Sequence, residues 1–311
     1  MQSFNIIKEI KPKKTFRNEK VIGMFDLSEK NYIQKFEGNF DLKENWNIGL
    51  IVGNSGTGKS TIAKQLFKTN IFDFKYDDNS IIDNMPQNKS VEEIIKTLNI
   101  CGFNTPTSYL KPYHVLSNGE KMRVDLANSL LQKNEIIVFD EYTSVIDRNV
   151  AKIASFATQK KIRELNKKFI AVSCHYDIEE WLMPDWVFDT NEMKIKYNER
   201  KYLRQPKLEF SIFETTEKRY YWELFSKYHY LNHSHNNASR VFVAYLNDDL
   251  CGIRSVLHFP HPKNDKIKRG HRLVILPDYQ GLGLGNILSN KIAEYFVNNE
   301  FDYYSLTSSP S

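Results

Sequence analysis

One eight-residue segment, Gly53-Asn54-Ser55-Gly56-Thr57-Gly58-Lys59-Ser60, has the residue types and spacing of a loop that binds nucleotide phosphates. Its glycines allow backbone N–H groups to turn toward phosphate oxygens, and a helix that begins directly afterwards adds a favourable dipole. We expect Lys59 to reach the β and γ phosphates and Ser60 to contact a magnesium ion, with Thr61 completing the set. A chance glycine-rich turn is the alternative.

Two adjacent carboxylates, Asp140 and Glu141, follow the apolar run 136–139. In this arrangement one carboxylate can hold a metal ion through water, while the next orients or deprotonates an attacking water. Taken alone, the pair is also compatible with a solvated strand end.

Strands and helices that would position these residues follow from the apolar pattern. Continuous apolar runs at 48–52, 136–139 and 169–173 predict buried parallel strands, because a half-solvated strand would alternate. Helices are expected at 59–67 and 150–168. Alternating strands and helices predict a parallel α/β sheet, and the run from Phe4 to Phe40 is expected to supply further strands.

The segment Leu116-Ser117-Asn118-Gly119-Glu120 resembles the signature of ATP-binding-cassette (ABC) ATPases, although that family has glycine at the position of Asn118 and glutamine at that of Glu120. Gln87 resembles the family's Q-loop glutamine. Asp147 ends a segment similar to the D-loop, and His175 resembles the switch histidine. Together with the phosphate loop, these motifs cover roughly the first 200 residues.

This resemblance implies an ATP hydrolase with ATP and Mg²⁺ as cofactors. It implies catalytic roles for Lys59, Glu141 and His175. The residues implied to contact ATP are those of 53–61 together with Gln87, Ser117, Asn118, Gly119, Glu120 and Asp147, and those implied to contact the metal are Ser60, Gln87 and Asp140.

The ABC resemblance also implies an ATP-dependent homodimer, in which Ser117 and Gly119 of one copy close on the ATP held by Lys59 of the other. An aromatic side chain usually stacks on adenine in this family; Phe25 and Tyr32 are candidates, and core packing is the role we favour for them. The segment between Gln87 and Ser117 is shorter than the one with which transporter ATPases grip a membrane partner. This shortness favours a non-transport role over a transporter subunit.

A second strand, glycine loop and helix run through 271–276, 278–285 and 286–296. The glycines are not spaced as in a dinucleotide-binding loop. The run resembles the Gln/Arg-x-x-Gly-x-Gly motif of GNAT acyltransferases, which implies that loop amides hold the pyrophosphate of coenzyme A or an acyl-CoA. The residues implied for this site are Val274, Leu276, Gln280, Gly281, Gly283 and Gly285. The sequence does not identify a single residue as the base that such a reaction needs.

Further strands are expected in this half at 208–213, 240–246, 252–259 and 303–307, with helices at 217–228 and 285–298. The GNAT fold continues beyond a fifth strand with another helix and two strands, whereas the chain stops at Ser311. We therefore expect a fold of α/β class, a P-loop ABC ATPase domain followed by a GNAT-like α+β domain; either the chain is a truncated product or this domain is incomplete as an enzyme.

Two polar segments of the second half are further candidates. His229, His233 and His235 could offer a base or metal ligands, but a solvated polar loop is favoured over a metal site because no carboxylate or cysteine is interleaved. Thr307, Ser308 and Ser309 could line an acceptor site, although hydroxyls at strand ends commonly cap turns.

The whole chain, at 311 residues, is long enough for two domains, and we place them at 1–200 and 201–311. The net charge of +5 is compatible with a nucleic-acid partner but does not require one. The three cysteines match no disulfide or zinc pattern, and no apolar run is long enough for a membrane helix. These features favour a cytoplasmic protein.

Fusions of an ABC ATPase with a GNAT-like domain resemble a prokaryotic and phage group related to Mom-type DNA modification proteins. Our leading hypothesis is therefore an ATPase coupled to an acyl-CoA-dependent transferase that acts on nucleic acid. A regulatory ATPase with an inactive GNAT-like interaction module and an ABC transporter subunit are the alternatives.

Overall fold

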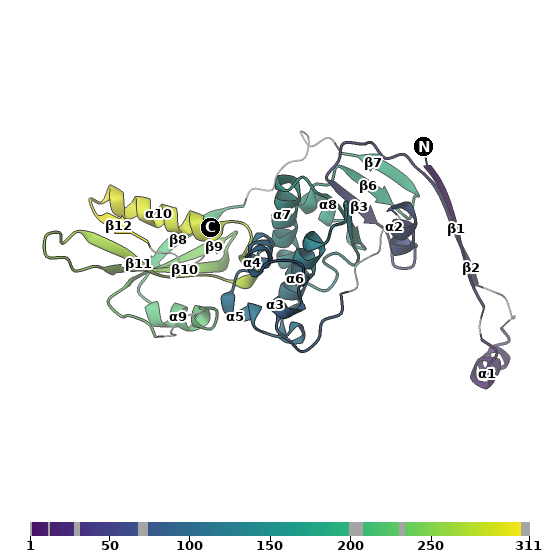
Figure 1. Cartoon of the computed structure of the whole chain (residues 1–311), viewed down its shortest axis with the longest axis horizontal. Coiled ribbons are helices and arrows are strands. Elements are labelled where there is room, and N and C mark those ends of the chain that lie inside the picture. The colour runs from purple at the N-terminus through teal and green to yellow at the C-terminus, as the bar shows by residue number, and fades with distance from the viewer. Residues whose placement is uncertain are drawn as a thin grey trace.

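The structure of the chain is a computed structural model that describes residues 2–11, 13–27, 32–67, 74–198, 208–229 and 234–305. Two five-stranded sheets lie side by side along the molecule, with helices between them, and a two-stranded arm projects from the first (Figure 1). The mixed α/β architecture predicted from the sequence is confirmed. No helix among these described residues is long and apolar enough to cross a membrane.

The first sheet has the strand order β4-β5-β3-β6-β7. Its strands are β3 (Ile48–Val52), β4 (Ile136–Phe139), β5 (Lys168–Ser173), β6 (Trp186–Asp189) and β7 (Lys194–Tyr197). β3 to β6 are parallel and β7 is antiparallel to β6. All five residues of β3 are buried, as its continuous apolar pattern predicts. Strands β6 and β7 were not anticipated.

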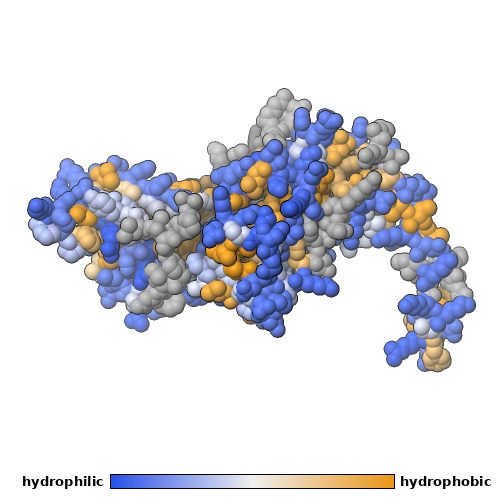
Figure 2. Space-filling model, viewed as in Figure 1, coloured by the Kyte–Doolittle hydropathy of each residue, from blue (hydrophilic) through white to orange (hydrophobic). Residues whose placement is uncertain are grey.

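Helices cover both faces of the first sheet and form a group next to the second sheet (Figure 1). The helices of this domain are α2 (Lys59–Phe67), α3 (Ile81–Asn84), α4 (Val91–Ile100), α5 (Pro106–Tyr109), η1 (Tyr113–Val115), α6 (Asn118–Leu131), α7 (Arg148–Glu164) and α8 (Ile178–Leu182). The predicted helix 59–67 is confirmed. Figure 2 shows that hydrophilic residues cover most of the visible face, with apolar residues over the helices between the sheets and again near the arm.

Gly49 of β3 leaves room for the indole of Trp186, which is fully buried on the next strand. A Cβ atom at Gly49 would lie 2.0 Å from the ring atom Cζ2 of Trp186. We expect Gly49→Ala to destabilise the chain by about 1–3 kcal/mol, because an added methyl group overpacks a closed core. Urea unfolding measures this, with Gly23→Ala as the control since nothing lies within 4 Å of a Cβ there. An unchanged midpoint for Gly49→Ala would contradict the packing described.

The arm consists of β1 (Gln2–Ile10) and β2 (Tyr32–Phe40), paired antiparallel, with α1 (Phe16–Met24) at its outer end (Figure 1). The strands were predicted in outline, but the helix was not. No residue of α1 is buried. The arm is anchored at its inner end, where Phe36 and Phe40 join a core cluster with Trp186.

The second sheet has the strand order β12-β11-β10-β9-β8. Its elements are β8 (Phe210–Thr215), α9 (Lys218–Ser226), β9 (Arg240–Leu246), β10 (Asp249–His258), β11 (Ile267–Ile275), η3 (Pro277–Tyr279), α10 (Leu284–Asn298) and β12 (Asp302–Tyr304). Helices α9 and α10 lie on opposite sides of this sheet (Figure 1). Every strand and helix expected in this half is found, with shifted ends. The domain boundary predicted near residue 200 falls outside the described residues and stays a prediction.

Candidate functional site

The loop between β3 and α2 has the backbone that a phosphate site requires. Gly56 and Gly58 both have φ of +84°, a left-handed conformation that favours glycine. A Cβ atom at Gly58 would lie 2.5 Å from the ring of Phe36, so the arm packs directly under the loop. The Lys59 ammonium donates to the carbonyl oxygens of Gly53 and Asn54, at 2.8 and 2.7 Å. The ammonium therefore lies over its own loop, where a phosphate would be bound.

Ser60 and Asp140 meet at one corner of this loop. The Ser60 hydroxyl donates to Asp140 Oδ1 at 2.9 Å, and the backbone N–H of Glu141 donates to the same oxygen at 3.0 Å. A hydroxyl beside a carboxylate is a ligand set that suits Mg²⁺, so the residues fit the predicted metal. When bound, Mg-ATP would supply the labile terminal phosphate bond and the metal that neutralises its charge.

Glu141 has a left-handed backbone with φ of +49°, which is uncommon for a residue with a side chain. Its neighbour Tyr142 fixes this turn, because the Tyr142 N–H donates to Val172 O at 2.8 Å and its carbonyl accepts from the Ser173 hydroxyl. Strained backbone of this kind is often found at functional sites. The turn presents the Glu141 side chain to solvent beside Asp140.

His175 and Gln87 occupy different surroundings. His175 follows β5 at the same sheet edge, and its N–H donates to Ser173 Oγ at 3.2 Å. The Gln87 amide donates to Asp83 O and Met85 O, at 2.7 and 3.2 Å. Its N–H hydrogens are therefore used within its own turn, and its predicted roles toward metal and ATP stay predictions.

Ser117 is the N-cap of α6 and forms a capping box with Glu120. The Ser117 hydroxyl accepts from the Glu120 N–H at 3.3 Å, and the Glu120 carboxylate accepts from the Ser117 N–H at 3.0 Å. The glutamate that replaces the family glutamine thus stabilises the helix start. Asn118 donates to Val145 O at 3.1 Å, which ties the signature to the D-loop, and Asp147 of that loop caps α7.

The aromatic candidates for adenine lie on the arm. Phe25 follows α1 at the outer end and is 67% exposed, so the core-packing role favoured for it is wrong. The reason is that the arm projects away from both sheets (Figure 1). The side chain of Tyr32 lies outside the described residues. A contact that sequence reasoning missed is the Lys8 ammonium, which donates to Thr61 Oγ1 at 2.5 Å.

The predicted coenzyme A residues lie where β11 meets α10. Gly283, with φ of +77°, precedes α10, and no side chain caps that helix start. Among the described residues nothing lies within 4 Å of a Cβ atom at Gly283, so this part of the chain leaves the helix start open, as a pyrophosphate site requires. Val274 is buried, while Leu276 and Gly285 are partly exposed. The assignment of this loop to coenzyme A stays a prediction.

Gln280 and Gly281 of the same loop contact the ATPase domain. The Gln280 amide donates to Ile275 O at 2.9 Å and to Thr105 Oγ1 at 3.4 Å, and its oxygen accepts from the Asn104 N–H at 3.4 Å. A Cβ atom at Gly281 would lie 3.2 Å from Gly102 Cα. Both residues therefore join the domains.

Arg123 of α6 is the charged residue at this interface and was not singled out from the sequence. Its guanidinium is buried, donates to Asp278 O at 3.1 Å and lies 3.9 Å from Asp278 Oδ1. A Cβ atom at Gly119 would lie 3.2 Å from the same Asp278 oxygen. Burial raises the pKa of the Asp278 carboxyl, and the Arg123 charge opposes that rise. A carboxylate of the second domain thus lies against the ABC signature.

His229 is not in a solvated loop as favoured from the sequence, whereas His235 is partly exposed in a segment of mostly exposed residues. His229 is buried, with its ring centroid 5.7 Å from that of Trp222, and that of His235 lies 6.0 Å from the same indole. The reason is that the indole of Trp222, buried on α9, lies beside both rings. His233, Thr307, Ser308 and Ser309 lie outside the described residues.

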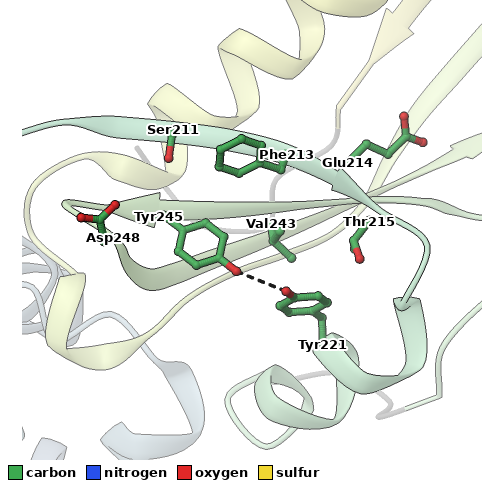
Figure 3. A pocket seen from close by; sticks show the side chains of 8 residues that line it. All are labelled: Ser211, Phe213, Glu214, Thr215, Tyr221, Val243, Tyr245 and Asp248. Atoms are coloured by element: carbon green, nitrogen blue, oxygen red, sulfur yellow. Dashed lines mark hydrogen bonds between the residues drawn. The ribbon is translucent and has the colours of Figure 1, made fainter.

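A pocket of about 420 Å³ lies on the α9 side of β8 and β9 (Figure 3). Tyr221 and Tyr245 point toward each other across it, with their hydroxyls 3.2 Å apart. This hydrogen bond raises the pKa of Tyr221. The pocket was not predicted, because its lining comes from β8, α9, β9 and the turn after β9, which are not local to one stretch of sequence.

Comparisons with known proteins identify two families in this chain. The ABC transporter family model matches residues 68–144, and the acetyltransferase (GNAT) family model matches residues 176–310. The chain thus contains an ABC-type ATPase domain followed by a GNAT region, as the sequence motifs predicted.

Curated relatives match the ATPase part. The chain is 34% identical over 134 residues to the energy-coupling factor transporter ATP-binding protein EcfA of Methanocaldococcus jannaschii, covering 42% of each chain. It is 29% identical to the Fe(3+) ions import ATP-binding protein FbpC of Photorhabdus laumondii, over 43% of this chain and 40% of the relative. It is 28% identical to the mRNA export factor elf1 of Schizosaccharomyces pombe, over 36% of this chain and 13% of the relative. The chain thus spans less than half the length of each.

Among solved structures, the dimeric structure of MJ0796, a bacterial ABC transporter cassette, matches 59% of this chain and 94% of that chain. The TM-score is 0.42 and the sequence identity is 16%.

Proposed function

We propose that the chain couples ATP binding and hydrolysis at the P-loop site to an acyl-CoA-dependent transfer reaction in its second domain. The contact between Arg123, Asp278 and the signature glycine Gly119 supports this coupling. Lys59, Ser60, Asp140 and Glu141 would hold and hydrolyse Mg-ATP. The loop that ends at the open start of α10 would hold coenzyme A. The same loop carries Asp278, which contacts the signature of the ATPase domain.

Coupling of this kind requires that the two ligands change each other's affinity. In a head-to-tail dimer, Ser117 and Gly119 would close on the ATP of the partner copy, and the γ phosphate would approach the helix start beside Asp278. A phosphate and a carboxylate close to each other repel. ATP binding would therefore shift the loop that carries Gln280 and Gly281. The dimer itself is part of the proposal.

The Asp278→Asn variant tests the coupling. We expect ATP to alter coenzyme A affinity in the wild type by about 5- to 150-fold, the usual range of allosteric coupling, and to alter it little in Asp278→Asn. Isothermal titration with coenzyme A, with and without a non-hydrolysable ATP analogue, measures this. Asp265→Asn, in an exposed loop of the same domain, is the control. Equal coupling in wild type and Asp278→Asn would contradict the proposal.

Two other functions predict different results. A regulatory ATPase with an inactive second domain would show no coenzyme A binding in the same titration. A transporter subunit, the function that the names of EcfA and FbpC give to those relatives, would co-purify with a membrane permease. The three free cysteines fit the cytoplasmic location that we propose.

The arm supports nucleic acid as the acceptor in this reaction. Lys11, Lys13, Lys14, Arg17 and Lys20 are all exposed at its outer end. The acidic residues among the described part of that end are Glu19 and Asp26, and Lys11 is paired with Glu9 of β1 at 3.6 Å. Exposed Phe16 and Phe25 add aromatic rings on which bases can stack. A cationic projection of this composition suits a phosphate backbone.

Reversing the arm's charge should weaken nucleic-acid binding. We expect the double variant Lys14→Glu with Arg17→Glu to lose at least about tenfold in affinity for a short DNA duplex and to show a shallower salt dependence. Fluorescence anisotropy over a series of salt concentrations measures both quantities. The control is Lys75→Glu with Lys263→Glu, which makes the same change of charge at exposed sites away from the arm. Equal losses in the two double variants would contradict a role for the arm.

A further inference from the structure

The α9 side of the second sheet carries four polar side chains that the proposed function does not use. We call them the histidine–arginine cluster; its members are His229, His235, His271 and Arg272. They come from the segment after α9, the segment before β9, and the middle of β11. Trp222 lies among them, with the Arg272 guanidinium carbon 6.0 Å from its ring centroid.

An irregularity between β10 and β11 brings His271 and Arg272 together. Ser255 pairs with Arg272 and Val256 pairs with Gly270, so His271 is an extra residue on β11. Such a bulge lets two successive side chains share one face of a sheet, which regular pleating forbids. Ser255 Oγ accepts from the Arg272 N–H at 3.0 Å and lies 3.5 Å from His271 Nδ1. One buried serine therefore fixes both residues.

Positive charge dominates the electrostatics of the cluster. Burial and the charges of Arg272 and Arg269, followed by His229 and His235, lower the pKa of His271 to about 4. Burial, Lys218 and Arg272 lower the pKa of His235. None of these acting charges is a carboxylate. Lys218 also acts on the carboxylate of Glu214, whereas the charges that act on His235 and His271 are all positive or imidazole.

Two buried nitrogen atoms of the cluster have no hydrogen-bond partner among the residues that the structure describes. They are Nε of Arg272, a residue only 9% exposed, and Nε2 of His235. Leaving a buried donor unsatisfied costs about 1–3 kcal/mol, and more for a charged group. Arg272 also forms no ion pair within the described residues, although a buried arginine is usually paired. Arg272 Nε is always a donor, so a partner for this cationic group would accept a hydrogen bond, and an anion would also balance its charge.

We propose that the histidine–arginine cluster binds a phosphate group of a ligand of the second domain. A guanidinium matches phosphate oxygens in a fork geometry, and imidazole N–H groups and Lys218 can meet the remaining oxygens. A phosphate dianion suits this site better than a single carboxylate, because Lys218, Arg269 and Arg272 all lie close enough to act on the imidazoles. Phosphate binding by this cluster does not depend on the proposed coupling between ATP and coenzyme A. Only the idea that the ligand takes part in acyl transfer depends on the proposed function.

Histidine side-chain NMR tests this site separately from the P-loop. With ¹⁵N-labelled histidine and the P-loop saturated by Mg-ADP, titration with inorganic phosphate is expected to move the resonances of His235 and His271. The Arg272→Met variant should bind phosphate at least about tenfold more weakly, since it loses a charge-assisted hydrogen bond. Lys218→Met, a change of a partly exposed residue that leaves the sheet intact, should weaken binding by a smaller factor. Arg219→Met, an exposed neighbour on α9, is the matched control.

Two ligands locate the source of the phosphate. A nucleoside 5′-monophosphate that moves these resonances, where the unphosphorylated nucleoside does not, assigns the phosphate to the acceptor. Coenzyme A that moves them, where pantetheine does not, assigns it to the donor. Resonances that stay unmoved by inorganic phosphate and both ligands, or equal binding by Lys218→Met and Arg219→Met, would overturn the proposal. If ATP did not change coenzyme A affinity but phosphate still bound to this cluster, the result would contradict only the proposed function.

Discussion

Glu141→Gln is expected to reduce ATP hydrolysis by about 10²- to 10⁴-fold while leaving ATP binding intact, because general-base catalysis contributes this much. Glu141 lies next to Asp140 on a left-handed turn whose N–H donates to the Asp140 carboxylate at 3.0 Å. Glutamine has the same shape and keeps that backbone bond, but its amide cannot accept a proton from water. Phosphate release over time measures the loss. Glu180→Gln, an exposed glutamate on α8, is the control.

The same variant reports on the dimer. If ATP joins two copies and hydrolysis separates them, Glu141→Gln should accumulate as a dimer at saturating ATP. Light scattering would give twice the 36.6 kDa of one chain for the variant, with the wild type returning to a monomer as ATP is consumed. A monomeric variant at saturating ATP would count against the head-to-tail arrangement, and hydrolysis at the wild-type rate would count against Glu141 as the base.

The sequence predicts the ATPase core well because its signals are local. The run from Ile48 to Val52 is apolar without alternation, and the glycine loop and Lys59 follow at once, so strand, loop and helix can each be assigned from a few neighbouring residues. The second domain's strands are predicted for the same reason. By contrast, β7 is short, polar and antiparallel, and only its pairing with β6 makes it a strand.

Contacts between distant segments could not be predicted. Arg123 reads as an ordinary charged position of an amphipathic helix until Asp278 is placed beside it, 155 residues later in the chain. His271 and Arg272 are consecutive, so a regular strand would place their side chains on opposite faces of the sheet. The bulge opposite Ser255 places them on one face. Phe25 was assigned to a core because aromatic rings are usually buried, yet its position on a projecting arm exposes it. Each of these depends on tertiary structure that local patterns do not encode.

Lys59→Ala is expected to abolish measurable ATP binding, a larger loss of affinity than any other single change at this site. In the structure the ammonium has two carbonyl partners, Gly53 O and Asn54 O, both in its own loop. An incoming phosphate offers it a negative charge in addition to hydrogen bonds, and such charge-assisted bonds are about twice as strong as neutral ones. Alanine would leave the backbone N–H groups to hold the terminal phosphates without any neutralising charge.

Because Lys59 is the first residue of α2 and alanine is a good helix former, the fold of this variant should be unaffected. Thermal unfolding without nucleotide should therefore match that of the wild type, while the stabilisation by ATP disappears, since a ligand stabilises only the state that it binds. Isothermal titration gives the affinity directly, and Lys64→Ala in the last turn of the same helix is the matched control. ATP binding by Lys59→Ala at wild-type affinity would show that the loop between β3 and α2 does not hold the terminal phosphates, and the proposed coupling would lose its starting point.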